Sequence, residues 1–255
     1  MRRGASELAQ RARRALSRRE YPVVPAHIGR LDYDGADIRV GVTSRTEILS
    51  RLRPSEKEPW TVAWLERTLG AGDVLYDVGA NVGAYSLIAA SLGREGVRII
   101  AVEPAFANYE ALCSNVVLNG LEQSIVPLPV LLGERTRLVE LAYRDTEAGT
   151  AEHAVGESGL LTLCYRLDDL VAGMALPAPT LLKIDVDGAE VPVLAGASAM
   201  LSRPELRSVL VEVERSGGDA VVDVLTQAGL GLTERIDERG GTPLAHVWYG
   251  IFERG

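Results

Sequence analysis

Short, nearly continuous apolar segments alternate along the chain with longer segments whose apolar content and Pro and Gly boundaries predict helices. The apolar segments are residues 74–78, 97–102, 125–132, 180–186 and 207–213, with two more at 230–236 and 246–252. The helical segments are residues 84–92, 104–119 and 219–228. Continuous apolar strands are typical of sheets buried on both faces. The pattern therefore predicts an α/β fold on a doubly wound, mostly parallel sheet.

The N-terminal part of the chain departs from this pattern. Residues 31–42 alternate in polarity around the turn signal at Asp34 and predict a hairpin. Residues 1–20 carry seven arginines on a weak helical pattern, which indicates a solvated helix, a dimer arm or a lid. We therefore expect an N-terminal extension of a basic helix and a hairpin at 1–53, followed by the main domain at 54–255.

The strongest local signal is the sequence VLYDVGANVG at Val74 to Gly83. An apolar strand that ends in a glycine turn and leads into a helix is typical of a ligand site at the helix N-terminus. Gly79 and Gly83 allow positive φ angles and a close approach of a ligand to the backbone around Asn81. Asp77 ends the strand, where its carboxylate could accept a hydrogen bond from an ammonium group.

The second predicted strand ends in Glu103, 24 residues beyond Gly79. An acidic residue at this distance suits the diol of a ribose, so the two signals together predict a nucleoside ligand. The spacing G-x-N-x-G lacks the second phosphate-binding glycine of a dinucleotide fingerprint. A nicotinamide-dependent oxidoreductase is therefore the weaker alternative.

Three motifs, DVGANVG, VEP and LKIDVDGAE, together resemble the FkbM family of S-adenosylmethionine-dependent methyltransferases, which modify hydroxyl groups of small molecules. The resemblance covers about residues 58–214, although the family usually has Glu where this chain has Asp187. It implies a Rossmann-like class I methyltransferase sheet of seven strands closed by an antiparallel pair. It also implies a cofactor site of Glu58, Asp77, Gly79, Asn81, Gly83 and Glu103.

Methyl transfer to a hydroxyl needs a group that removes the proton, or a metal that acidifies the hydroxyl. Asp185 follows the fourth strand, and Glu212 and Glu214 end the fifth, so the three carboxylates should meet at one edge of the sheet. Their oxygens would suit Mg²⁺. In the alternative without a metal, Asp187 caps the next helix and Asp185 keeps a catalytic role. Lys183, inside the fourth strand, is expected to pair with buried carboxylates.

His153 is the histidine best placed to act as a base in the absence of magnesium. It lies in a polar, glycine-containing stretch between predicted strands at 137–143 and 160–165. Loops of this length inside a compact domain usually have a function, so we expect this one to contact the substrate. The catalytic candidates are therefore Asp185, His153 and Glu214.

The composition restricts the partners. A net charge of −8 argues against nucleic acid, whereas an acidic cleft tolerates a sulfonium cofactor. Two cysteines without metal-ligand spacing and the lack of a long apolar stretch predict a cytoplasmic protein that does not enter the membrane. We expect a natural-product or sugar-derived small molecule as the substrate and permit a homodimer. A methyltransferase-like scaffold without turnover is the non-enzymatic alternative.

Overall fold

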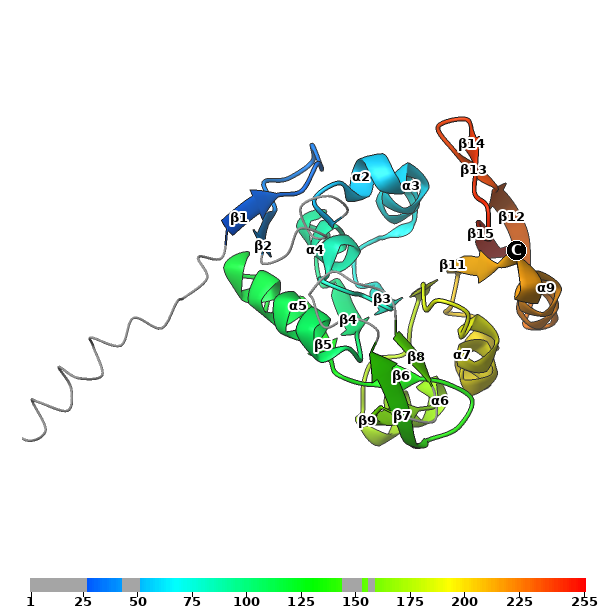
Figure 1. The fold of residues 1–255 in the computed structure, drawn as a ribbon. Helices are drawn as coiled ribbons and strands as arrows, with labels where there is room; N and C mark the ends of the chain where they lie inside the picture. Colours follow the sequence, from blue (N-terminus) through cyan, green and yellow to red (C-terminus); the bar gives the residue numbers. More distant parts are fainter. Residues whose placement is uncertain (1–26, 43–50, 144–152, 156–158) are drawn as a thin grey trace, which may run out of the picture.

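The computed structural model describes residues 27–42, 51–143, 153–155 and 159–255, which form an α/β domain around one large sheet (Figure 1). The strand order in this sheet is β12-β15-β11-β10-β3-β4-β5. The strands in that order are Leu230–Ile236, Val247–Arg254, Ser208–Glu214, Leu181–Ile184, Val74–Val78, Arg98–Val102 and Ile125–Leu128. Only β15 runs antiparallel to its neighbours within this sheet. The seven-stranded, mostly parallel sheet predicted from the sequence is confirmed.

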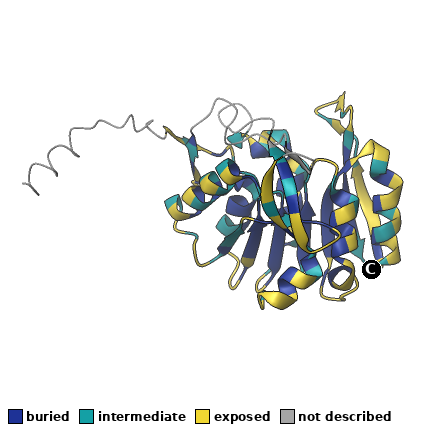
Figure 2. Cartoon of the chain, turned by 60° about the horizontal axis from the view of Figure 1, so that its bottom comes forward, coloured by how far each residue is buried: buried dark blue, intermediate teal, exposed yellow. Residues whose placement is uncertain are grey.

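Helices cover both faces of the sheet, and Figure 2 shows the buried strands between helices whose outer sides are exposed. One hydrophobic cluster joins the sheet to α6 (Leu167–Gly173), α7 (Glu190–Gly196), α8 (Ser198–Leu201) and α9 (Gly218–Gln227). A second cluster joins the other face to α3 (Pro59–Thr68), α4 (Ala84–Ser91) and α5 (Phe106–Leu118). The short helix α2 (Pro54–Lys57) precedes α3, and a 3-10 turn, η2 (Arg215–Gly217), precedes α9. The fold is therefore doubly wound, as predicted.

The predicted third strand is wrong beyond Leu128. The chain turns at Pro129, and β6 (Leu131–Leu132) joins a separate sheet of order β6-β9-β7-β8. The other strands of this inserted sheet are β7 (Arg137–Tyr143), β8 (His153–Val155) and β9 (Leu160–Tyr165). Proline is tolerated in β5 itself, at Pro127, because β5 is an edge strand.

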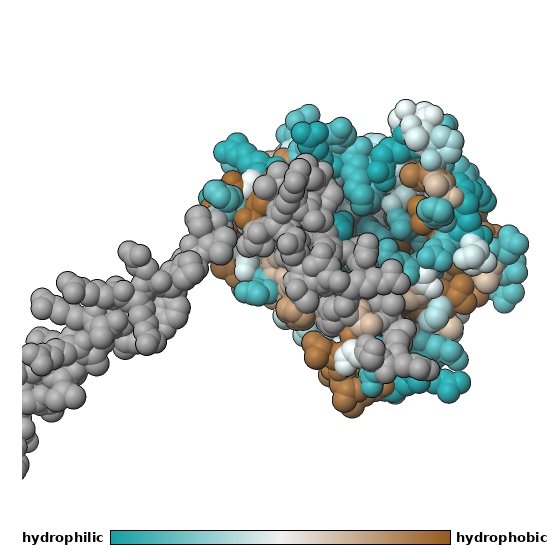
Figure 3. All heavy atoms as spheres, in the orientation of Figure 1, coloured by the Kyte–Doolittle hydropathy of each residue, from teal (hydrophilic) through white to brown (hydrophobic). Residues whose placement is uncertain are grey.

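The inserted sheet has two different faces. Val139 and Leu141 of β7 are buried on the inner face. On the outer face Leu138, Leu161 and Leu163 are exposed, and Figure 3 shows hydrophobic residues gathered at the bottom of the molecule, where Figure 1 places β7 and β9. The alternation along β7 follows from the two-residue period of a strand.

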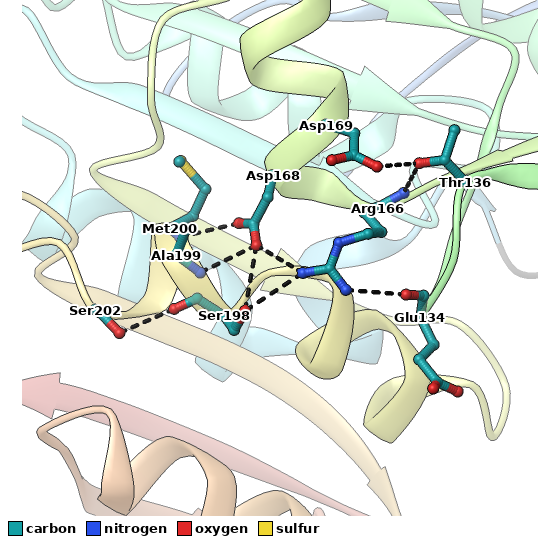
Figure 4. A network of polar contacts seen from close by, with 9 residues as sticks. All are labelled: Glu134, Thr136, Arg166, Asp168, Asp169, Ser198, Ala199, Met200 and Ser202. Atoms are coloured by element: carbon teal, nitrogen blue, oxygen red, sulfur yellow. Dashed lines mark hydrogen bonds and ion pairs between the residues drawn. The ribbon is translucent and has the colours of Figure 1, made fainter.

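A polar network fixes the inserted sheet to the helices beneath it (Figure 4). The Arg166 guanidinium donates a hydrogen bond of 3.0 Å to the backbone carbonyl of Glu134 and pairs with Asp168 at 2.9 Å. The backbone N–H of Arg166 donates to the Thr136 hydroxyl at 3.1 Å. Asp168 also accepts hydrogen bonds from two backbone amides in the first turn of α8. This network therefore holds the inserted sheet in place against α6 and α8.

The predicted hairpin is present as β1 (His27–Arg30) and β2 (Arg39–Val42), with strands that begin earlier than expected. Residues 1–26, including the predicted basic helix, lie outside the described part of the chain. A second hairpin, β13 (Glu238–Arg239) and β14 (Thr242–Pro243), projects between β12 and β15. In the described residues no helix is both long and apolar enough to cross a membrane.

Asn115 of α5 joins the N-terminal hairpin to the glycine turn. Its Oδ1 accepts a hydrogen bond of 2.8 Å from the Gly41 amide, and its Nδ2 donates one of 2.9 Å to the Val82 carbonyl. We expect Asn115→Ala to lower the free energy of unfolding by about 1–3 kcal/mol, because the partly buried Gly41 amide and the buried Val82 carbonyl lose their partner. Chemical denaturation measures this, with Ser114→Ala, at an exposed position of the same helix, as the comparison. Equal, small losses in both variants would contradict the expectation.

Candidate functional site

A cavity of about 560 Å³ opens at the C-terminal ends of β3, β4 and β10. The main sheet supplies its floor through residues that follow these strands, and the inserted sheet supplies a wall through Val139 and Leu141. This is the edge at which open parallel sheets bind ligands. The volume lies in the range of cofactor and small-molecule sites.

The glycine turn after β3 takes the conformation that its sequence predicts. Gly79 has a φ of 80°, and a Cβ there would lie 1.8 Å from the carbonyl oxygen of Asp185. Asn81 also has a positive φ, of 52°. Gly83, with a φ of 90°, begins α4, where a Cβ would lie 2.5 Å from Leu112 Cδ1. Gly79 and Asn81 line the cavity, but Gly83 does not, so Gly83 shapes the turn from beneath.

Glu103 follows β4 directly and lines the cavity with its carboxylate almost fully buried. Oε2 accepts a hydrogen bond of 2.8 Å from the Asn81 amide, and Oε1 accepts one of 2.9 Å from the Ala105 amide. Burial raises the pKa of Glu103 to about 7, against the opposing effect of these hydrogen bonds. The carboxylate is therefore fixed in position by two backbone amides and by the Asn108 side chain.

Asp77 occupies a different place from the one predicted. It is fully buried within β3 and is not among the described residues that line the cavity. Its Oδ2 accepts a hydrogen bond of 2.6 Å from the Ser86 hydroxyl, and its Oδ1 lies 3.5 Å from Lys183 Nζ. The ammonium group that Asp77 faces is thus a lysine on the neighbouring strand.

Lys183 is the buried counter-ion of two carboxylates. Its side chain is 1% exposed, and its Nζ lies 3.1 Å from Asp185 Oδ2 in addition to the contact with Asp77. The Tyr85 ring lies 5.1 Å from the ammonium. Burial would lower the pKa of Lys183, but the charges of Asp185 and Asp77 outweigh it and hold that pKa above its usual range. The predicted structural pairing of Lys183 is confirmed.

Asp185 connects this buried pair to the cavity. It follows β10, lines the cavity and is 24% exposed at its side chain. Burial opposes its ionisation, but the positive charge of Lys183 outweighs it and holds the pKa of Asp185 below its usual range. Asp185 is therefore an anion with one oxygen fixed by Lys183.

Glu212 lines the cavity beside Asp185, but its pKa is shifted in the opposite direction. Burial and the charge of Asp185 raise the pKa of Glu212 to about 8, while a hydrogen bond from the Tyr249 hydroxyl acts against them. Burial and the charge of Asp185 also raise the pKa of Asp187, to about 6. At this edge of the sheet Asp185 is therefore firmly ionised, whereas Glu212 and Asp187 titrate near neutral pH.

The three carboxylates predicted to bind magnesium do not form a metal site among the described residues. No group of three or more acidic, histidine or cysteine side chains in that part of the chain is arranged to hold a metal ion. Asp185 is committed to Lys183, and Glu212 accepts the Tyr249 hydroxyl. Glu214 is exposed and does not line the described cavity. Among the described residues the carboxylates are therefore not arranged for the near-octahedral coordination that Mg²⁺ requires.

Glu58 is fully buried at the start of α3, outside the described cavity lining, where it pairs with Lys57 Nζ at 2.8 Å. The backbone of His153 pairs with Tyr143 in the inserted sheet, while its side chain lies outside the described part of the chain. Sequence reasoning missed Arg51, Lys57 and Tyr249. The only signal for Lys57 was the scarcity of lysine, since the chain has just two.

Comparisons of the sequence with a family model and with known proteins point to the same family. The family model described as the methyltransferase FkbM domain matches residues 77–230. The chain is similar to the hexuronic acid methyltransferase AglP of Haloferax volcanii, with 27% identity over 203 residues that cover 78% of this chain and 80% of that one. It is also similar to the 31-O-demethyl-FK506 methyltransferase FkbM of Streptomyces tacrolimicus, with 29% identity over 65% of this chain and 74% of that one.

A solved structure supports the fold. The methyltransferase FkbM from Methylobacillus flagellatus KT aligns with a TM-score of 0.50 and 18% sequence identity. The match covers 72% of this chain and 45% of that chain, so it spans less than half of the solved protein. At this identity the likeness concerns the fold alone.

Proposed function

Because the chain belongs to the FkbM methyltransferase family, we propose that it transfers the methyl group of S-adenosylmethionine to a hydroxyl group of a small molecule. One observation carries the proposal: the fixed Glu103 carboxylate and the Gly79–Asn81 turn meet in one cavity at the C-terminal edge of the sheet. Methyltransferase activity follows from the family. The cofactor-binding residues, the oxygen acceptor and the catalytic residues are the proposal.

The cavity fits S-adenosylmethionine by the chemistry of its donors. Glu103 would hold the ribose diol, because its carboxylate lines the cavity and each of its oxygens is positioned by a backbone amide. The Gly79 turn would leave room for the sugar and the chain beyond it. Val130 and Leu132, which follow β5, would flank the adenine with apolar surface. Asp77 and Gly83 would support this site from beneath, without touching the ligand.

Bound cofactor supplies an electrophilic methyl group on a sulfonium, so the protein has to place the acceptor oxygen in line and take its proton. Asp185 is the residue we propose for the proton, because it is ionised, faces the cavity and has one oxygen fixed by Lys183. Glu212 lies at the same edge and could receive a hydrogen bond from the acceptor. His153 stays a second prediction for the base, from the strand beside β7.

Magnesium has no part in this proposal, because the donor set described above does not fit it. The positive charge that a metal would bring is already supplied by Lys183, which faces Asp185. Glu214 accepts a hydrogen bond of 3.3 Å from Ser216 and is exposed, so we assign it no step.

The acceptor class rests on the relatives. One is named for a hexuronic acid and the other for a macrocyclic natural product, 31-O-demethyl-FK506. We therefore propose a sugar-derived or natural-product hydroxyl as the acceptor. A cytoplasmic location, the exclusion of nucleic acid, the homodimer and the division at residue 53 stay predictions from the sequence.

Isothermal titration with S-adenosylmethionine and S-adenosylhomocysteine tests the cofactor, and transfer of a labelled methyl group to a panel of sugars, uronic acids and macrolides tests the acceptor. We expect micromolar binding and transfer of the labelled methyl group to a hydroxyl oxygen, which gives a methyl ether. Binding without transfer to any acceptor would favour the scaffold alternative. Binding of a nicotinamide dinucleotide in place of both ligands would favour the oxidoreductase.

The pKa of about 7 at Glu103 predicts a pH dependence of cofactor binding. The ionised carboxylate accepts both ribose hydroxyls, whereas the protonated form loses one acceptor site. We therefore expect the affinity for S-adenosylhomocysteine to fall as the pH drops below 7, by at most about tenfold for each pH unit, and to level off above 7. Titrations between pH 5 and 7.5 measure this slope.

The control for this experiment is Glu103→Gln, which removes the titrating group. Asp187 and Glu212 also titrate near neutral pH, so the wild-type slope alone does not identify Glu103. Glu103→Gln should bind more weakly and with little dependence on pH. If the variant keeps the wild-type slope, Glu103 is not the linked group.

A further inference from the structure

Two cations enter the cavity from the segment that precedes the main sheet. Arg51 lies just before α2 and Lys57 ends it, and both line the cavity. The Lys57 ammonium lies 2.8 Å from the buried Glu58 Oε1, and its side chain is 32% exposed. A lysine has three N–H donors, so this contact leaves donors that can face a ligand.

The order of the strands fixes the direction of a nucleoside cofactor along the sheet edge. With its ribose at Glu103, after β4, and its adenine beside Val130, after β5, the remaining chain has to cross β3 toward β10. The methionine end would then lie between Gly79 and Asp185. This end carries one ammonium and one carboxylate.

The charges around that end are divided in the same way. Asp185 and Asp187 are the anions on the side of β10. Arg51 and Lys57 are the cations close to them, since the charge of each acts on both carboxylates and lowers their pKa values against the effect of burial. The other two cations of the described lining, Arg135 and Arg137, belong to the inserted-sheet side: Arg135 pairs with Glu134 and is 75% exposed, and Arg137 begins β7 and is exposed.

We infer that Arg51 and Lys57 bind the carboxylate of the cofactor's methionine end. The inference rests on the proposed function. A guanidinium can hold a carboxylate through two parallel hydrogen bonds, and Lys57 adds a point charge from the next turn of the chain. The buried Glu58 then has an indirect role: it holds Lys57 in place and does not touch the ligand. This replaces the direct cofactor contact predicted for Glu58 from the sequence.

Paired titrations with S-adenosylhomocysteine and 5′-methylthioadenosine test the inference. Both ligands contain the adenosine part, but methylthioadenosine lacks the amino-acid end. Arg51→Met and Lys57→Met should each weaken S-adenosylhomocysteine binding about 10- to 100-fold, the range expected for a lost charged hydrogen bond. Methylthioadenosine binding should change by no more than about twofold. The measurement needs no acceptor and no turnover.

Arg53→Met is the matched control, because Arg53 lies on the same segment, is 65% exposed and pairs only with Glu56 among the ion pairs of the described residues. It removes the same charge and should leave both affinities unchanged. Equal losses of both ligands in the Arg51 and Lys57 variants, or unchanged S-adenosylhomocysteine binding, would overturn the inference. Lys57→Met leaves the buried Glu58 carboxylate without this charge partner. Binding of methylthioadenosine shows whether that variant is folded.

Failure of the proposed function gives a different result. A wild-type protein that binds neither ligand contradicts S-adenosylmethionine as the cofactor and removes the basis of this inference with it. A wild-type protein that binds both ligands with the same affinity supports the nucleoside site but overturns the role of Arg51 and Lys57.

Discussion

Replacing Lys183 by methionine is expected to lower the free energy of unfolding by about 3–5 kcal/mol, the range for removing one partner of a buried ion pair. The side chain is 1% exposed and is the counter-ion of Asp77, which is equally buried. Methionine fills a similar volume but leaves the Asp77 carboxylate without a charge partner in the core. Urea or guanidinium denaturation at pH 7 measures the loss.

Two comparisons distinguish the effect of the unpaired buried charge on stability from the general effect of substituting a residue. Arg67→Met removes an exposed pair with Glu253, at 3.6 Å, and should change stability by less than about 1 kcal/mol. The double variant Lys183→Met with Asp77→Asn should regain part of the loss, because it removes the unpaired charge as well as its partner. A double variant less stable than the sum of the two single changes would contradict the ion-pair explanation.

The elements of the main sheet could be predicted because their signals are local. β12 has the predicted bounds, and β10 and β11 agree within two residues at each end, since an apolar segment buried on both faces leaves a clear pattern. The position of Glu103 was equally predictable, because the end of β4 and the glycine turn of β3 are adjacent in any parallel pair.

The missed features depend on contacts between distant residues. Asp77 and Lys183 are opposite each other in the register of β3 and β10, 106 positions apart in the chain, and a sequence pattern does not contain that register. Glu212 and Tyr249 are partners in the same way across β11 and β15. The inserted sheet was predicted as strands and a loop, but its role as a cavity wall depends on the packing of Val139 and Leu141 against the distant main sheet.

The balance between Asp77, Lys183 and Asp185 links stability to chemistry. A lysine shared by two carboxylates keeps the deeper one neutralised and the outer one ionised and oriented. Since the neighbouring Glu212 has a pKa of about 8, Asp185 is the member of this pair of carboxylates that stays charged at neutral pH. The same ion pairs thus stabilise the core and set the protonation state at the cavity.

Asp185→Asn is accordingly expected to reduce turnover about 10²- to 10⁴-fold, the range for loss of a general base. The amide is nearly isosteric and can still accept a hydrogen bond from Lys183, so cofactor affinity should change by less than about tenfold. Transfer of a labelled methyl group, measured in a single turnover with an acceptor found in the panel, gives the rate. Titration with S-adenosylhomocysteine gives the affinity.

Glu214→Gln and His153→Gln decide between Asp185 and the other two catalytic candidates. Glu214 is exposed outside the described cavity lining, so its replacement should leave turnover within about threefold. A large loss in His153→Gln together with a small one in Asp185→Asn would transfer the role of base to the inserted sheet. If Asp185→Asn loses turnover but keeps the wild-type pH dependence of S-adenosylhomocysteine binding, Asp185 removes the proton and Glu103 is the group linked to binding. The two effects can be distinguished because the carboxylates follow different strands, and because the pKa of Glu103 is raised whereas that of Asp185 is lowered.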